Sequence, residues 1–178
     1  MKVVLFDLGD TLVESFSSGY RLIEGAMDLL KGIESMNDVD NRKIVMGIVS
    51  DTHKPEELPL SEDDQLIRKN RTLHILESVN IKEYFEPTDV HLTLSTDIGF
   101  TKTQNLEEFF IISLGKLSNN INLNDIIFVT EFESHIIKAK TLGVQTYHYT
   151  PQSISENDNT INKLINLIPK IQVILNNS

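Results

Sequence analysis

Two carboxylates, a hydroxyl and a lysine in this chain have the types and positions that phosphoryl transfer would require. Asp7, Ser50 and Glu131 each stand at or just after the end of a short apolar run, and Lys102 precedes a helical pattern. A carboxylate can attack phosphorus to form an aspartyl-phosphate, and lysine and hydroxyl donors can neutralise the phosphoryl oxygens. Two carboxylates at strand ends can hold Mg²⁺. Any one of these residues alone more often caps a turn or a helix, so the prediction rests on the four together.

The elements that must position these residues alternate between strand and helix along the chain. The predicted strands are the apolar runs at 2–6, 44–49, 91–94, 125–129 and 144–149, and the helices predicted from three-and-four spacing are 20–36, 61–79, 105–116, 133–142 and 160–168. This alternation favours parallel strands with right-handed crossovers. We therefore predict a single α/β domain over residues 1–178, with a doubly wound, Rossmann-like, mostly parallel sheet. Ligands of such sheets bind beyond the carboxyl ends of the strands, where the four residues would meet.

Several residues predict where the helices begin and end. Ser61 and Asp64 have the spacing of an N-terminal cap. Gly143 is predicted to end the helix at 133–142, and Pro169 to stop the helix at 160–168. A final apolar segment follows at 171–175.

Composition limits the possible function classes. The chain has 178 residues, 40% of them hydrophobic and 24% charged, which is typical of a globular protein. The net charge of −10 disfavours nucleic acid as a main partner. The absence of cysteine excludes disulfides and thiolate metal sites. No apolar run is long enough for a membrane span, and the first residues do not resemble a signal peptide, so we expect a cytoplasmic protein without a membrane partner.

Four segments in order resemble the motifs of the haloacid dehalogenase superfamily. Residues 4–12 (VLFDLGDTL) are similar to the first motif, hhhhDxDGTL; residues 48–52 (IVSDT) resemble the second; and Lys102 in GFTK resembles the third-motif lysine. Residues 126–131, continued through His135, Ala139 and Gly143, align without gaps with the fourth motif, GDxxxDxxxAxxAG. The resemblance covers roughly residues 1–150.

The resemblance assigns expected roles to the site residues. It implies that Asp7 is the nucleophile, that Ser50 with Asp51 and Lys102 binds the phosphoryl group, and that Lys102 also takes part in catalysis. It implies Mg²⁺ as the cofactor, held by Asp7, Glu131 and the backbone carbonyl of Gly9. The expected substrate is a small phosphorylated molecule or a phosphorylated macromolecule.

The chain departs from the family pattern at two places that bear on catalysis. Gly9 replaces the second aspartate of the first motif, which is the general acid/base of the phosphatases, and Asp10 is a candidate substitute. A lost proton donor costs on the order of 10²–10⁴ in rate. His135 replaces the second aspartate of the fourth motif. We expect it to face solvent or the cleft rim, with transition-metal binding as the alternative. The other histidines, His53, His74, His91 and His148, are predicted to lie on the surface or on a strand face.

Family members usually carry a cap domain, and this chain leaves no room for one. Residues 12–43 hold little more than one predicted helix, and residues 50–102 are accounted for by one helix and one strand. The loop at 53–60, which contains two prolines, is the best candidate for a partial lid.

Three functions remain open from the sequence. The first is a Mg²⁺-dependent phosphatase that works through Asp7. The second is a catalytically impaired relative that binds or regulates, which the residues Gly9, Thr130 and His135 favour. The third, a 2-haloacid dehalogenase, would need a cap to bury an apolar substrate and would need no Mg²⁺.

Overall fold

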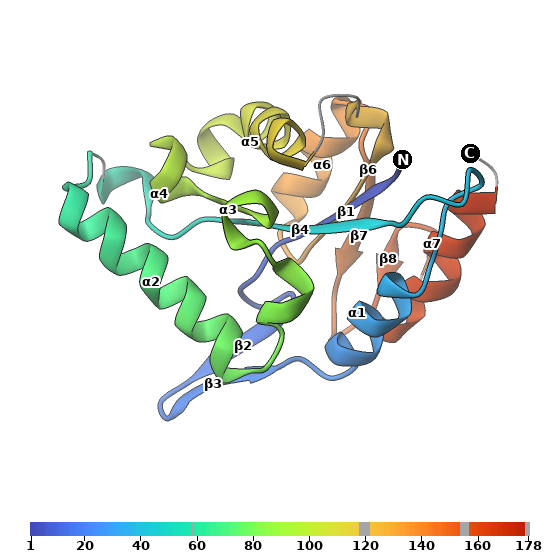
Figure 1. The fold of residues 1–178 in the computed structure, drawn as a ribbon, viewed down its shortest axis with the longest axis horizontal. Helices are drawn as coiled ribbons and strands as arrows, with labels where there is room; N and C mark the ends of the chain where they lie inside the picture. Colours follow the sequence, from blue (N-terminus) through green and yellow to red (C-terminus); the bar gives the residue numbers. More distant parts are fainter. Residues whose placement is uncertain (58, 118–121, 154–156, 177–178) are drawn as a thin grey trace.

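The protein is built around a six-stranded sheet in which every pair of neighbours is parallel. The computed structural model describes residues 1–57, 59–117, 122–153 and 157–176. The strand order is β5-β4-β1-β6-β7-β8 (Figure 1). The strands are β1 (Val3–Phe6), β4 (Val45–Ser50), β5 (Leu92–Leu94), β6 (Ile126–Thr130), β7 (Gln145–Tyr149) and β8 (Thr160–Ile161). This confirms the predicted doubly wound α/β class.

The central strand β1 is apolar throughout because helices cover both faces of the sheet. Val4 and Phe6 point into one hydrophobic cluster, and Val3 and Leu5 point into the other. This alternation is the period of two that a strand imposes on its side chains. The predicted strands at 2–6, 44–49, 91–94, 125–129 and 144–149 all match strands of the structure to within one or two residues.

Helices pack on the two faces of the sheet in separate layers (Figure 1). One face is covered by α1 (Ala26–Glu34), α2 (Glu62–Ser78) and α7 (Leu167–Asn176), and the other by α5 (Lys102–Leu117) and α6 (Glu133–Thr141). The shorter helices are η1 (Pro55–Glu57), η2 (Lys82–Phe85), α3 (Thr88–His91), α4 (Ser95–Ile98), η3 (Leu123–Asp125) and η4 (Leu164–Asn166). In the described ranges, no helix combines the length and apolarity needed to span a bilayer.

The prediction of a helix at 20–36 is wrong for its first part. Residues 13–22 form an antiparallel hairpin of β2 (Val13–Phe16) and β3 (Gly19–Leu22), and α1 begins only at Ala26. Gly25 has a left-handed backbone with φ 82°, which a helix interior does not allow. The prediction failed because Leu22 and Ile23 pack against the core from the hairpin, at a spacing that also fits a helix.

The prediction for the C-terminal part is also wrong. Thr160 and Ile161 form the edge strand β8, and the last helix, α7, runs through Pro169 to Asn176. Pro169 is the third residue of α7, in the first turn, where the missing N–H would have no helical partner. The apolar segment at 171–175 therefore belongs to α7, and Ile171 and Leu175 are buried in the core.

Two predicted helix ends are confirmed. The Ser61 hydroxyl accepts a hydrogen bond from the N–H of Asp64 at 3.1 Å and caps α2. Gly143 follows the end of α6 with φ 78°, a conformation that favours glycine. The helix predicted at 105–116 begins earlier, at Lys102, and Asn105 interrupts its regular geometry with φ −149° and ψ 82°.

Candidate active site

The sheet brings the predicted site residues together at the carboxyl end of its central strand. Asp7 directly follows β1, which lies between β4, ending at Ser50, and β6, ending at Thr130. A cleft of 690 Å³ opens at this edge. Its walls include every residue that the sequence proposed for catalysis, phosphate binding or metal binding: Asp7, Gly9, Asp10, Ser50, Asp51, Lys102 and Glu131.

A buried ion pair occupies the floor of the cleft. The ammonium group of Lys102 contacts Oδ2 of Asp7, and the two side chains are 2% and 5% exposed. Lys102 also donates to the carbonyl of Val49 at 3.3 Å. Asp7 accepts the N–H of Leu8 at 2.9 Å and the hydroxyl of Thr130 at 3.2 Å. Charge-assisted bonds of this kind hold the carboxylate in one orientation.

A second carboxylate, Glu131, meets Asp7 at the Thr130 hydroxyl. Its Oε2 lies 3.4 Å from Thr130 Oγ1 and also accepts the hydroxyl of Thr11. Thr11 in turn accepts the N–H of Glu131 at 3.2 Å. Burial, together with the negative charge of Asp7, raises the pKa of Glu131 to about 7. A bound cation would relieve this unfavourable proximity of two carboxylates.

The donors present fit Mg²⁺ with few protein ligands. Within the residues that the structure describes, no group of three or more His, Asp or Glu side chains could hold a metal by itself. Mg²⁺ commonly uses one or two carboxylates and completes its shell with water and substrate phosphate. Asp7 and Glu131 would supply the carboxylates, with the Gly9 carbonyl as a further candidate on the same cleft wall.

Ser50 and Asp51 line the cleft at the end of β4 and have different surroundings. Ser50 is buried and lines the cleft. Asp51 accepts the backbone N–H of Lys102 at 2.8 Å, so its carboxylate anchors the start of α5 beside the cleft. Burial raises the pKa of Asp51, although the charge of Lys102 opposes this effect. A carboxylate offers no donor to a phosphoryl oxygen, so the hydroxyl of Ser50 is the better phosphate-binding group of the two.

Asp10 lies at the mouth of the cleft, whereas Asp7 lies at its floor. The side chain of Asp10 is exposed, and the Asp10 backbone is left-handed with φ 52°, a conformation that aspartate tolerates. The N–H of Asp10 donates to the carbonyl of Val13 at 2.8 Å, which holds the turn. At Gly9, a Cβ atom would meet nothing within 4 Å, so the position that carries an aspartate in the family has room for one.

His135 does not face solvent, as one of the sequence-based alternatives expected. It lines the cleft but is only 3% exposed, its ring lies 5.2 Å from that of Phe132, and its Nε2 is 3.5 Å from Thr103 Oγ1. Its Nδ1 is buried with no hydrogen-bond partner among the described residues. Burial and the nearby Lys102 charge lower the pKa of His135 to about 4, so the ring is neutral at pH 7.

The prediction of a surface position is also wrong for His53. This side chain is 6% exposed, lines the cleft, and has its Nδ1 2.9 Å from Ser95 Oγ. The cause is α4, which folds Ser95 over the loop from 42 residues away. His148, in β7, lies on a strand face as predicted, and its Nε2 donates to the Glu131 carbonyl at 2.8 Å. His91 is half-buried, and His74 is exposed.

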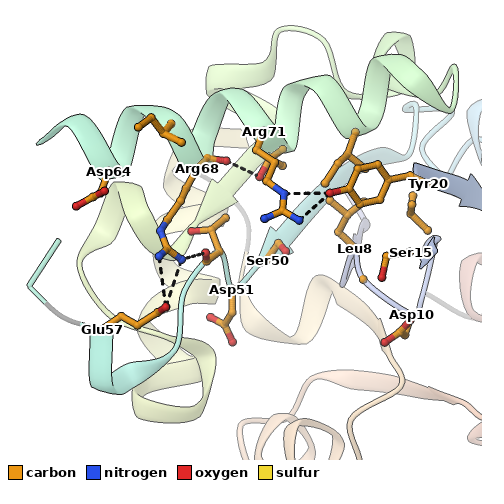
Figure 2. Close-up of a pocket in the computed structure, with 16 residues that line it drawn as sticks. Leu8, Asp10, Ser15, Tyr20, Ser50, Asp51, Glu57, Asp64, Arg68 and Arg71 are labelled. Carbon is orange, nitrogen blue, oxygen red and sulfur yellow. Dashed lines mark hydrogen bonds and ion pairs between the residues drawn. The ribbon is translucent and has the colours of Figure 1, made fainter. Parts of the chain in front are cut away.

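Several residues that shape the site were not predicted from the sequence. Thr11 and Thr130 bond to the carboxylates. Thr130 ends β6 and Thr11 lies in the polar segment that follows β1, and these positions were the available signal. Arg68 and Arg71 of α2 line a second cavity beside the cleft (Figure 2). In the loop predicted as a partial lid, Glu57 forms an ion pair with Arg68. Of this loop, His53, Lys54, Pro55 and Glu57 line the cleft.

Comparison with known proteins identifies the fold to which this architecture corresponds. No protein-family model matches the chain, and no curated protein matches it. Among solved structures, a HAD-superfamily hydrolase of subfamily IA from Geobacter sulfurreducens superposes with a TM-score of 0.62 at 10% identity, covering 95% of this chain and 98% of that one. The protein has the haloacid dehalogenase (HAD)-like fold.

Two further structures share the HAD-like fold of this chain. An uncharacterized protein from Listeria monocytogenes has a TM-score of 0.59 and 15% identity over the full length of both chains. YfnB from Bacillus subtilis, described as a HAD-hydrolase and solved bound to magnesium, has a TM-score of 0.52 and 17% identity. The match to YfnB covers 87% of this chain and 56% of YfnB. At these identities the likeness establishes the fold and leaves activity to be argued from the site.

Proposed function

We propose that the protein is a Mg²⁺-dependent phosphohydrolase that acts through an aspartyl-phosphate on Asp7. The observation that carries this proposal is the buried ion pair of Asp7 and Lys102 at the carboxyl end of the central strand, with Glu131 beside it. A nucleophile, a cation and a second carboxylate then line one cleft with the Ser50 hydroxyl. This is the set of groups that phosphoryl transfer uses.

In the proposed reaction, a carboxylate oxygen of Asp7 attacks the phosphorus of a phosphomonoester. The bond from phosphorus to the leaving oxygen breaks, and that oxygen takes a proton, for which Asp10 at the cleft mouth is the candidate donor. Water then hydrolyses the aspartyl-phosphate, which releases inorganic phosphate and restores Asp7. Lys102 and Ser50 bind the phosphoryl oxygens throughout.

Asp7, Glu131 and the Gly9 carbonyl are the proposed holders of Mg²⁺. When bound, the ion would supply Lewis-acid stabilisation of the phosphoryl charge. YfnB, a structural neighbour solved with magnesium, supports this choice of metal by analogy of fold. The net charge of −10 favours a phosphorylated small molecule or protein over nucleic acid as the partner, and we propose a cytoplasmic location.

The proposal is tested by steady-state hydrolysis of para-nitrophenyl phosphate with Mg²⁺ and with EDTA. Asp7→Asn removes the nucleophile and is expected to lower kcat by at least about a thousandfold. Asp28→Asn makes the same chemical change at an exposed residue of α1, away from the cleft, and is expected to keep wild-type activity.

The outcomes separate the rival functions. Turnover that requires both Mg²⁺ and Asp7 supports the phosphatase. Folded wild-type protein whose rate does not exceed that of Asp7→Asn would contradict it and would favour a binding role, which Gly9 already favours. In that case, Asp7-dependent binding of Mg²⁺ or inorganic phosphate is the expected remaining property. Asp7-dependent dehalogenation of a 2-haloacid without metal would instead identify a dehalogenase.

A further inference from the structure

A second cavity, of 620 Å³, opens directly beside the proposed catalytic cleft (Figure 2). It lies between α2 and the β2–β3 hairpin, and its volume is in the range of small-molecule sites. Gly9, Asp10, Ser50 and Asp51 line both this cavity and the cleft, so the two spaces share a wall. A molecule whose phosphoryl group lay at Ser50 could therefore extend into the second cavity.

Two arginines of α2 line the cavity, and their charges are used differently. Arg68 forms an ion pair with Glu57, at 3.2 and 3.4 Å, and also donates to the carbonyl of Thr52 at 2.7 Å. Arg71 donates through Nε and Nη2 to the hydroxyl oxygen of Tyr20, at 3.0 and 2.8 Å. In the part of the chain that the structure describes, Arg71 forms no ion pair.

The hydroxyl of Tyr20 fixes the Arg71 guanidinium without neutralising it. A guanidinium has five N–H donors, and only two of the Arg71 donors are used by Tyr20. The simplest structural role of this contact is to join the hairpin to α2, and that role alone would need no charge. An orientated cation at the wall of a cavity, in a protein of net charge −10, is in addition a site for an anion.

The carboxylates that line the same cavity mostly have other partners. Glu57 is paired with Arg68, Asp51 accepts the N–H of Lys102, and Asp64 accepts the hydroxyl of Ser61. Figure 2 shows Asp64 and Glu57 at the Arg68 end of the cavity, with Tyr20 and Ser15 at the Arg71 end. An anion beside Arg71 would therefore lie away from Asp64 and Glu57. Asp10, which Figure 2 shows on the Ser15 side, is the remaining carboxylate of the cavity wall.

We propose that this cavity binds the leaving-group part of the substrate, and that Arg71 binds a second anionic group on it. This inference rests on the proposed phosphohydrolase function and specifies its substrate class. The substrate is then a phosphomonoester of an alcohol that carries a carboxylate or a second phosphate. The apolar part of the cavity wall, formed by Leu8, Val13, Ile67 and Ile75, suits the carbon chain between the two anionic groups.

The test compares alkyl phosphates with ω-carboxyalkyl phosphates and α,ω-alkyl bisphosphates that have two to six methylenes. For the wild type, kcat/KM for the best doubly anionic compound should exceed that of its alkyl match by about 10- to 100-fold, the value of one charge-assisted interaction. Whether the carboxylate or the bisphosphate series is preferred identifies the second group. Arg71→Gln should abolish the preference while hydrolysis of plain alkyl phosphates remains.

Two control variants make the test specific. Lys69→Gln removes a positive charge from the same helix, but Lys69 pairs with Asp97 and does not line the cavity, so the preference should persist. Tyr20→Phe retains the arginine but removes the hydroxyl that positions it. It should raise KM for doubly anionic substrates without lowering kcat for alkyl phosphates.

Failure of this inference is distinguishable from failure of the proposed function. Hydrolysis of plain and doubly anionic compounds at equal kcat/KM, or a preference that survives in Arg71→Gln, would overturn the inference alone. If the wild type hydrolyses none of them, the proposed function fails. Calorimetric binding of the same bisphosphates then decides the inference, which stands if affinity depends on Arg71 and falls if it does not.

Discussion

Replacing Lys102 tests whether the cleft floor depends on the Asp7–Lys102 ion pair for stability. Both side chains are almost fully buried, so neither charge is well solvated without the other. Lys102→Met retains an unbranched side chain and removes the ammonium group. It leaves Asp7 and Glu131, which meet at the Thr130 hydroxyl, without their nearest cation.

Removal of one partner from a buried pair typically costs about 3–5 kcal/mol of the free energy of unfolding. In a chain of 178 residues, each kcal/mol shifts Tm by about 2–4 °C, so Lys102→Met should lower Tm by roughly 10 °C. The double variant Asp7→Asn with Lys102→Met removes both charges. It should be more stable than the sum of the single variants predicts, with a coupling energy of about 2 kcal/mol or more.

Urea unfolding at pH 8, with EDTA present so that bound metal cannot replace the lysine, measures the four free energies of this cycle. Lys69→Met is the matched control, because Lys69 forms a partly exposed pair with Asp97 and such pairs contribute about 0–1 kcal/mol. A cost for Lys102→Met no larger than for this control, or a cycle without coupling, would refute the electrostatic account of the cleft.

Two further predictions concern the residues that depart from the family pattern. Burial lowers the pKa of His135 to about 4 in the folded protein, whereas the same side chain in the unfolded chain has a pKa of about 6.5. Between these two pH values, the unfolded chain binds a proton at His135 and the folded protein does not. Stability should therefore fall as pH drops through this window, by about 3 kcal/mol from this residue, and His135→Gln should remove that part. At Gly9, Gly9→Asp should raise kcat for alkyl phosphates by about 10- to 100-fold, because it adds a proton donor in open space.

Controls for both predictions are available in the chain. His74 is exposed on α2, so His74→Gln should leave the wild-type dependence of stability on pH, and the same slope in His135→Gln would contradict the first prediction. Aryl phosphates leave without needing a proton, so Gly9→Asp should accelerate them much less than alkyl phosphates. Equal effects on the two classes would show that proton donation does not limit the rate.

The sheet could be predicted from the sequence because its strands are buried on both faces. Val3 to Phe6 and Ile126 to Thr130 consist almost wholly of apolar residues, and no helix spacing competes with that pattern. The order of the strands then placed Asp7, Ser50 and Glu131 at one edge by a general rule of parallel sheets. For this reason Asp7, Ser50 and Glu131 line one cleft, as the sequence predicted.

The hairpin and the last helix could not be predicted because local spacing is ambiguous there. Leu22, at the end of β3, and Ile23, which follows it, contact the same core as they would from a helix. Only the left-handed Gly25 distinguishes the two arrangements. Pro169 stops a helix in its interior but is tolerated in its first turn. The position of the helix start, which the sequence left uncertain, decides which applies.

Contacts between distant segments explain why the histidines and arginines were missed. His53 is buried by Ser95, and Arg71 is oriented by Tyr20, which is 51 residues away. The partners in each pair are too far apart in the sequence for any local pattern to predict the contact. Hydrogen-bond partners of this kind become visible only when the sheet order and the helix packing are known.

The glycine and aspartate at positions 9 and 10 stand in the reverse of the family order, and both line the second cavity as well as the cleft. In the usual family order, the proton donor follows the nucleophile by two residues; here the carboxylate stands one residue later, exposed, on a left-handed turn. Asp10 lines both the cleft and the cavity that holds Arg71. In a substrate that reaches from Asp7 to Arg71, the leaving oxygen would lie beside this shared wall. Asp10 is therefore placed to donate a proton to a leaving group bound in that cavity.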